Sequence, residues 1–196
     1  MPFRERRIVT LLMMCLFLAK ATPCWCADNV ASTEPQAPAE ELKQFTLLPG
    51  FRAELFASEP QIGKPLNFAF DARGRLWVTQ SSLYPFSAKE GEGQDRVTIL
   101  EDTDGDGKAD RFTVFADNLN IPIGILPVAK GAIVYSIPNI YRLYDDDGDG
   151  KADRKELLYG PFEYKDTHGM VSSLTRGFDG WIYACHGYSN HSKVSG

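Results

Sequence analysis

Short apolar segments separated by turn residues run along most of the chain. The segments "LNFAFD", "GAIVYSI" and "DGWIYA" are rich in β-branched and aromatic residues and carry apolar side chains on both faces, which is typical of strands packed between neighbouring sheets. The Gly and Asp residues of "FDARGRLW" and "RGFDGWIY" are typical of the turns that close β-hairpins. The pattern therefore predicts an all-β fold of short antiparallel strands.

The same order of strands occurs twice and then begins a third time. The third copy starts with "SSLTRGFDGWIYACHG", and the sequence stops at Gly196 before the outer strands of that copy. A repeat of about 40 to 50 residues with four short strands is the signature of a β-propeller blade. We therefore predict a partial β-propeller with two complete four-stranded blades and part of a third, and a small β-sandwich is the alternative. The predicted strands span residues 66–70, 75–80, 96–101 and 111–116 in the first copy and 123–128, 132–137, 140–145 and 155–159 in the second.

Two stretches fall outside this regular order. The first copy contains the additional stretch "SSLYPFSAKEGEG" at residues 81–93, which we assign to a loop because insertions between repeats map to loops. The segment "FRAELFAS" at residues 51–58 is interpreted as an outer strand of a blade that this sequence does not complete. We therefore expect the sequence to be the beginning of a longer protein.

The N-terminal residues have the pattern of a secretory signal peptide. Arg4, Arg6 and Arg7 precede an apolar run at residues 8–19, which Lys20 and Pro23 interrupt. We predict a signal peptide at residues 1–26, an exposed linker rich in Ala, Pro, Glu and Gln at residues 27–44, and the incomplete propeller domain at residues 45–196. The protein is then exported to the periplasm or cell envelope, and an uncleaved membrane anchor is the alternative.

Charge and cysteine content exclude several classes of protein. The formal net charge is -5, and removal of the signal peptide with its four basic residues and Glu5 changes it to -8. A nucleic-acid partner is not expected, because binding to phosphates needs clustered Lys and Arg. Cys185 is the only cysteine after residue 26, so the domain has no disulfide framework. The chain contains no Cys-x-x-Cys-His sequence and thus no site for a c-type haem.

An acidic phrase is the strongest metal-binding pattern in the chain. It reads "DTDGDGKAD" at residues 102–110 and "DDDGDGKAD" at residues 145–153. Alternate carboxylates before a glycine match the start of a calcium loop, and Ca²⁺ prefers such oxygen ligands. Strand-like residues follow each phrase, so we expect hairpin loops and not EF-hands, and the alternative is a solvated Asp-Gly turn without a metal. The predicted ligands are Asp102, Asp104, Asp106, Asp110 and the carbonyl of Lys108 in the first loop, and Asp145, Asp147, Asp149, Asp153 and the carbonyl of Lys151 in the second.

The three histidines are predicted to share one face of the propeller. Loops that enter the first strand of a blade lie on the same face as loops between its second and third strands, because successive strands run in opposite directions. This face therefore gathers His168, His186 and His191. The acidic loops join third and fourth strands and so belong to the opposite face.

Several motifs resemble one known family. The stretches "GFRAELFASEP", "NFAFDARGRLWVTQ" and "RGFDGWIYACHG" and both acidic loops resemble the N-terminal propeller of planctomycete membrane-bound dehydrogenase-domain proteins of the haem-binding type. The chain is more distantly similar to the quinoprotein glucose and sorbosone dehydrogenases, in which a histidine shortly precedes a Gly-Pro-Asp-Gly hairpin. His168 and "GFDGWIY" occupy these places, and Phe178 stands where that family has proline.

The resemblance implies a function. His168 would be the catalytic base that takes a proton from a sugar or alcohol hydroxyl beside pyrroloquinoline quinone. The full-length relatives would add further blades and a c-type haem domain, so this short chain is expected to be inactive alone. We therefore interpret the protein as the N-terminal part of an exported quinoprotein-dehydrogenase-like propeller. The alternative is a calcium-stabilised propeller that binds a glycan or protein partner without catalysis.

Overall fold

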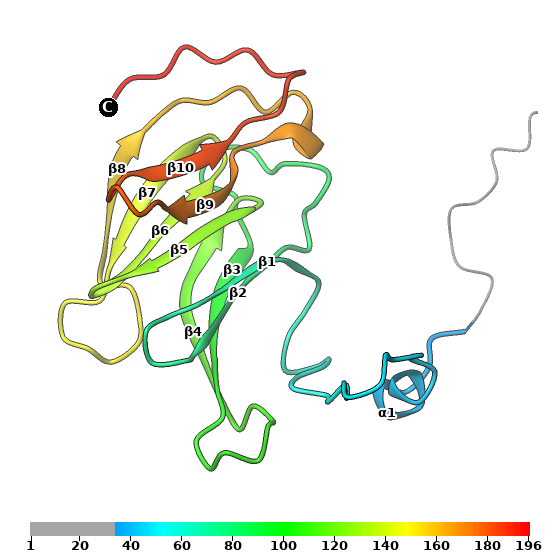
Figure 1. Cartoon of the computed structure of the whole chain (residues 1–196). Coiled ribbons are helices and arrows are strands. Elements are labelled where there is room, and N and C mark those ends of the chain that lie inside the picture. Colours follow the sequence, from blue (N-terminus) through cyan, green and yellow to red (C-terminus); the bar gives the residue numbers. More distant parts are fainter. Residues whose placement is uncertain (1–33) are drawn as a thin grey trace, which may run out of the picture. The chain divides into compact units, whose positions relative to one another are not determined.

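Strands in three antiparallel sheets make up nearly all the regular structure of residues 34–196, the part of the chain that the computed structural model describes (Figure 1). Within each sheet, strands that follow one another in the sequence are neighbours. The first sheet contains β1 (Pro65–Phe70), β2 (Leu76–Gln80), β3 (Asp95–Glu101) and β4 (Arg111–Leu119). The second contains β5 (Gly124–Val128), β6 (Gly131–Ser136), β7 (Asn139–Tyr144) and β8 (Arg154–Tyr159). The third consists of β9 (Ser172–Arg176) and β10 (Ile182–Cys185).

The predicted all-β class and the eight strands predicted for the two complete copies are confirmed. Each strand of the first two sheets lies within three residues of its predicted ends, and β4 deviates most because it continues to Leu119. The hairpin turns also form as predicted. Asp71 accepts hydrogen bonds from the backbone N–H of Arg73 (2.9 Å) and Arg75 (3.0 Å) and from the indole of Trp77 (3.0 Å). This single aspartate therefore closes the β1–β2 turn and ties it to the core.

The first strands of the three sheets lie next to one another, because β5 contacts both β1 and β9. Between the first two sheets lies a buried core in which Trp77 and Phe115 pack edge to face, with ring centroids 4.6 Å apart. A second core, below the loops that lead into β5 and β9, consists of Ile121, Tyr135, Ile137, Ile140, Met170 and Val171. These two cores fix the spacing of the sheets.

The interpretation of residues 51–58 as a strand is wrong for the described part of this chain, because no neighbouring strand pairs with them. The segment still occupies a place equivalent to β4. The backbone N–H of Ala109 donates to the carbonyl of Phe56 (2.9 Å), just as that of Ala152 donates to the carbonyl of Phe115 (2.7 Å). Residues 51–58 thus support the first acidic loop as β4 supports the second.

The N-terminal part of the described chain is exposed. The short helix α1 (Pro38–Leu42) lies inside the predicted linker and has no buried residue. The predicted signal peptide at residues 1–26 and the start of the linker lie outside the described residues. Within residues 34–196, the structure contains no helix of sufficient length and apolar character to cross a membrane.

One buried carboxylate connects the first sheet to the loops above it. Asp95, at the start of β3, is 2% exposed. Its Oδ2 accepts hydrogen bonds from the hydroxyl of Ser81 (2.5 Å) and the backbone N–H of Ile121 (2.9 Å), and its Oδ1 accepts one from the N–H of Ser82 (2.8 Å). The insertion at residues 81–93 and the passage into β5 are therefore held by the same side chain.

We predict that Asp95→Asn lowers the free energy of unfolding by about 2–3 kcal/mol, because an amide NH₂ group would face backbone donors and leave one of them unpaired. Urea denaturation followed by far-UV circular dichroism measures the change. The exposed Asp117→Asn is the matched control and should change the stability by less than about 0.5 kcal/mol. Equal effects of the two substitutions would contradict a central role of Asp95.

Candidate functional site

The two groups of predicted site residues lie on opposite sides of the sheets. In Figure 1 the β3–β4 and β7–β8 loops, which carry the acidic phrases, project from one end of the strands, and residues 160–171 and the chain after β10 cross the other end. This separation agrees with the strand directions expected from the sequence.

Each acidic loop brings three carboxylates together. Oxygen atoms of Asp102, Asp104 and Asp106 lie within 4.8 Å of one another, and those of Asp145, Asp147 and Asp149 do the same. Carboxylate oxygens this close repel one another unless hydrogen bonds or a cation offset the charge. Three convergent oxygens can provide part of the shell of a hard cation such as Ca²⁺.

The two loops have the same internal hydrogen bonds. Asp102 accepts from the N–H of Gly105 (2.7 Å) and Gly107 (2.9 Å). The corresponding pair in the second loop is Gly148 (2.7 Å) and Gly150 (3.2 Å), which donate to Asp145. Gly107 and Gly150 have φ values of 88° and 87°, a left-handed conformation that glycine adopts without steric cost. The repeated sequence thus produces a repeated geometry.

The fourth predicted carboxylate of each loop does not join the triad. Asp110 accepts hydrogen bonds from the backbone N–H (3.2 Å) and hydroxyl (2.7 Å) of Thr103, and Asp153 accepts one from the N–H of Asp146 (2.7 Å). Both therefore close the base of their loop. The predicted carbonyl ligands belong to Lys108 and Lys151, whose N–H groups donate to Asp106 and Asp149 (both 2.8 Å).

Hydrogen bonds lower the pKa of several loop carboxylates. The N–H of Gly107 makes the largest contribution to the lowered pKa of Asp102. The pKa of Asp146 is lowered chiefly by the guanidinium of Arg154, whose Nε lies 2.7 Å from Oδ2 of Asp146. Asp102 is thus stabilised by backbone dipoles and Asp146 by an ion pair, and only the second effect depends strongly on salt.

On the opposite side, His168 lies in a single 3₁₀ turn, Thr167–Gly169. Oδ1 of Asp166 accepts a hydrogen bond from the backbone N–H of His168 (3.0 Å) and lies 3.2 Å from its Nδ1. The N–H of His168 is also the main cause of the lowered pKa of Asp166. The imidazole is 73% exposed and contacts the ring of Tyr84 edge to face. Sequence reasoning missed Asp166, although the Asp-x-His spacing of "KDTHGM" could have indicated it.

Three loops meet at this turn. The side-chain amide of Asn190, 5% exposed, donates to the carbonyls of Asp166 (2.8 Å) and Gly169 (3.0 Å). The hydroxyl of Thr167 donates to the carbonyl of Pro85 in the insertion (2.9 Å). Gly187 lies so close to Gly169 that a Cβ atom there would meet the opposing backbone at 2.3 Å. The turn that carries His168 is therefore held by buried and backbone contacts, although its imidazole is open to solvent.

The other two histidines lie on neighbouring segments. The ring of His186 packs against Phe162, with centroids 5.8 Å apart, and its Nε2 lies 3.2 Å from the hydroxyl of Ser192. The backbone N–H of His191 donates to the carboxylate of Glu163. His186 therefore directly precedes Gly187, which contacts Gly169, and the structure gives His191 a backbone role.

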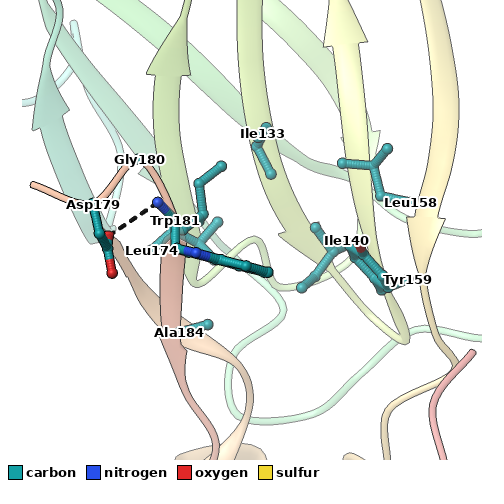
Figure 2. Close-up of a pocket in the computed structure, with 10 residues that line it drawn as sticks. Ile133, Ile140, Leu158, Tyr159, Leu174, Asp179, Gly180, Trp181 and Ala184 are labelled. Atoms are coloured by element: carbon teal, nitrogen blue, oxygen red, sulfur yellow. Dashed lines mark hydrogen bonds between the residues drawn. The ribbon is translucent and has the colours of Figure 1, made fainter. Parts of the chain in front are cut away.

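A cavity of about 430 Å³ lies between the second sheet and the β9–β10 hairpin (Figure 2). Apolar side chains such as Ile133, Ile140 and Leu158 form most of its wall, and the indole of Trp181 faces them. The one carboxylate, Asp179, accepts hydrogen bonds from the N–H of Trp181 (3.1 Å) and the hydroxyl of Tyr183 (2.6 Å). The cavity has the chemistry of a hydrophobic contact between sheets, and its one carboxylate is engaged by these two hydrogen bonds.

Comparison with known proteins identifies one family. The model of the family described as "Domain of unknown function (DUF7133)" matches residues 37–196. This match includes α1 and all three sheets. No curated protein and no solved structure matches the chain.

We predict that Asp102 titrates below the ordinary aspartate pKa of 3.8. Since the folded loop favours the ionised form, its contribution to stability is complete above 3.8 and is lost as the pH falls through the lower folded-state pKa. The carboxyl-carbon chemical shifts of Asp102 and Asp146, measured by NMR during an acid titration, give the pKa of each residue. Added salt should raise the pKa of Asp146 more than that of Asp102; a midpoint for Asp102 at or above 3.8 would contradict the prediction.

Proposed function

Since the chain belongs to the family of domains of unknown function DUF7133, whose extent covers all three sheets, we propose that these sheets are successive blades of a β-propeller. Two observations support this arrangement. The first strands of the sheets lie side by side, as strands around a propeller axis do. Each acidic loop rests on the segment that precedes its own sheet, through Ala109 on Phe56 and through Ala152 on Phe115.

The proposed function is that of an exported, quinoprotein-dehydrogenase-like propeller segment whose His-bearing face removes a proton from a sugar or alcohol hydroxyl. The Asp166–His168 pair is the observation that carries this proposal. A carboxylate beside Nδ1 favours the tautomer with a proton on Nδ1 and leaves Nε2 to accept the proton of a hydroxyl. The exposed imidazole is accessible to such a substrate.

The described residues do not by themselves fit the quinone that the family resemblance implies. The structure gives His168 and His186 contacts with Asp166, Tyr84, Phe162 and Ser192, and none of these residues is cationic. A quinone that carries several carboxylates needs cationic partners, Arg above all. We therefore propose that this chain binds the substrate and removes the proton. We assign none of its described residues as the acceptor of the electron pair.

A calcium-stabilised module that binds a glycan or protein partner is the second candidate function. The observation that favours it is the convergence of three carboxylates in each acidic loop. In both candidates the cation would have a structural role, since the acidic loops and the histidines lie at opposite ends of the sheets. Bound Ca²⁺ would offset the repulsion between the carboxylates and stiffen the loops against β4 and residues 51–58.

We predict that the purified chain binds Ca²⁺ but not Mg²⁺, because a flexible loop of carboxylates does not meet the octahedral demand of the smaller ion. The affinity should be that of an extracellular module, with dissociation constants on the order of 10⁻⁴ to 10⁻³ M. Isothermal calorimetry measures the binding heat. Asp104→Ala and Asp147→Ala should each remove one binding event, and Asp117→Ala serves as the control. If the double variant still shows a heat of Ca²⁺ binding, these loops are not the binding site.

We predict that His168→Gln lowers turnover of a sugar or alcohol by roughly a hundredfold or more, the usual contribution of a general base. The assay uses the purified protein, supplied with calcium and with a dye as electron acceptor. Asp166→Asn should lower kcat and alter its pH profile while KM stays constant, because Asp166 only orients the imidazole. His191→Gln is the matched control. Full activity of His168→Gln with unchanged folding would leave the binding module as the function.

A further inference from the structure

A second cavity, of about 370 Å³, lies on the same side of the sheets as His168. It separates the insertion at residues 81–93 from the outer strands of the second sheet. The insertion contributes Lys89 and Glu90, the second sheet contributes Asn139, Tyr141 and Lys155, and the segment before His168 contributes Tyr164. In contrast to the apolar cavity beside Trp181, this one is lined by lysine, glutamate, asparagine and tyrosine residues together with Ile137 and Pro138.

The cavity wall is held in place by several contacts. Buried Asn120 accepts a hydrogen bond from the N–H of Ala88 (3.1 Å) and donates one to its carbonyl (2.9 Å). Gly93 fits against Leu119 so closely that a Cβ atom would lie 2.5 Å from the carbonyl oxygen. Asn118 has a φ value of 54°, a conformation that few non-glycine residues adopt. The insertion is thereby fixed over the second sheet, and such preorganisation reduces the entropy cost of binding a ligand.

Several polar groups in the cavity have spare hydrogen-bonding capacity. The amide of Asn139 donates to the hydroxyl of Tyr141 (2.8 Å), which leaves the phenolic proton to donate to a ligand. The ammonium of Lys155 lies 4.8 Å from the centre of the Tyr141 ring. Within the described residues, Lys89, Glu90 and Lys155 form no ion pair. These three charged side chains can therefore contact a polar ligand without breaking an ion pair.

The charges decide which polar ligand fits best. Two ammonium groups and one carboxylate line the cavity, whereas the chain as a whole has a net charge of -5. The local excess of positive charge favours a ligand with one negative group. Tyrosine hydroxyls, an amide and a carboxylate are groups that hydrogen-bond to the hydroxyls of a sugar ring, and a cavity of this volume lies in the range that encloses a small molecule.

We propose that this cavity binds a sugar acid, with its carboxylate between Lys89 and Lys155 and its hydroxyls bonded to Tyr141, Tyr164 and Glu90. The inference deepens the proposed function, because it names the substrate class, and it rests on that function for what happens after binding. The insertion links the two places: Tyr84 and Pro85 contact the turn that carries His168, and residues 88–93 line the cavity.

The test compares three probes by isothermal calorimetry on the purified chain. Glucuronate should bind at least about tenfold more tightly than glucose, a difference of about 1.4 kcal/mol, and acetate should give no measurable heat. Lys155→Met should weaken glucuronate binding by on the order of tenfold and leave glucose unchanged, because it removes one charge-assisted contact. Tyr141→Phe should weaken both sugars. Lys130→Met, in the β5–β6 turn on the side of the acidic loops, is the matched control and should change neither.

The possible outcomes are distinct. Equal affinity for glucose and glucuronate would overturn the proposal. Glucuronate binding that is unchanged in the double variant Lys155→Met and Lys89→Met would also overturn it. If acetate binds as tightly as glucuronate, the cavity is an unspecific anion site. Thermal melting of each variant establishes that it is folded. Loss of turnover in His168→Gln without any glucuronate binding by the parent chain would contradict the cavity assignment and leave the proposed base intact.

Discussion

The loops around His168 depend on the buried carboxylate of Asp95. An ionised carboxylate removed from water costs several kcal/mol unless hydrogen bonds compensate it. Asp95 obtains this compensation from Ser81, Ser82 and Ile121, which belong to two segments far apart in the sequence. These segments must therefore meet whenever the first sheet is folded. Ile121 has a φ value of 45°, an unfavourable conformation for a β-branched residue, and the hydrogen bond to Asp95 helps to offset its cost.

The acidic loops have a packing role that is independent of any metal. Ala109 and Ala152 each donate a backbone hydrogen bond to the segment that precedes their sheet. The carboxylate of Glu54 lies against Gly107 as the methyl group of Thr113 lies against Gly150. The two copies of the acidic phrase therefore repeat a contact with the preceding segment as well as a loop conformation. A cation bound by the carboxylates would strengthen a contact that the backbone already makes.

The insertion gives the His-bearing side its particular character. The second sheet has no equivalent of residues 81–93, because β6 and β7 are joined by a tight turn. Tyr84 reaches the imidazole of His168, and Lys89 and Glu90 reach the polar cavity. One loop thus joins the proposed base to the proposed sugar-acid cavity. A movement of this loop would affect both, while the strands beneath it remain in place.

Local sequence patterns determined the strands, the hairpin turns and the carboxylate triads, because each depends on residues a few positions apart. The alternation of apolar segments and turns located the eight strands of the first two sheets and the start of the third copy, and the Asp-x-Asp-x-Asp-Gly spacing placed Asp102, Asp104 and Asp106 around one point. Strand direction also placed the histidines opposite these loops. In contrast, Asp110 and Asp153 matched the metal-binding pattern but do not join the triads. Each accepts a hydrogen bond from a backbone N–H near the start of its loop, that of Thr103 or Asp146, and so closes the loop.

Only the tertiary structure decided which distant groups meet. Asp95 precedes the strand predicted at residues 96–101, and its partner Ile121 follows β4 in the sequence. The residues of the polar cavity come from the insertion, the second sheet and the segment before His168, and no periodicity connects them. Residues 51–58 have the composition of a strand but lack a neighbour in the described chain. The physical reason is the same in each case: burial and hydrogen bonding are satisfied by whichever groups the folded sheets bring together, and sequence spacing does not encode those distances.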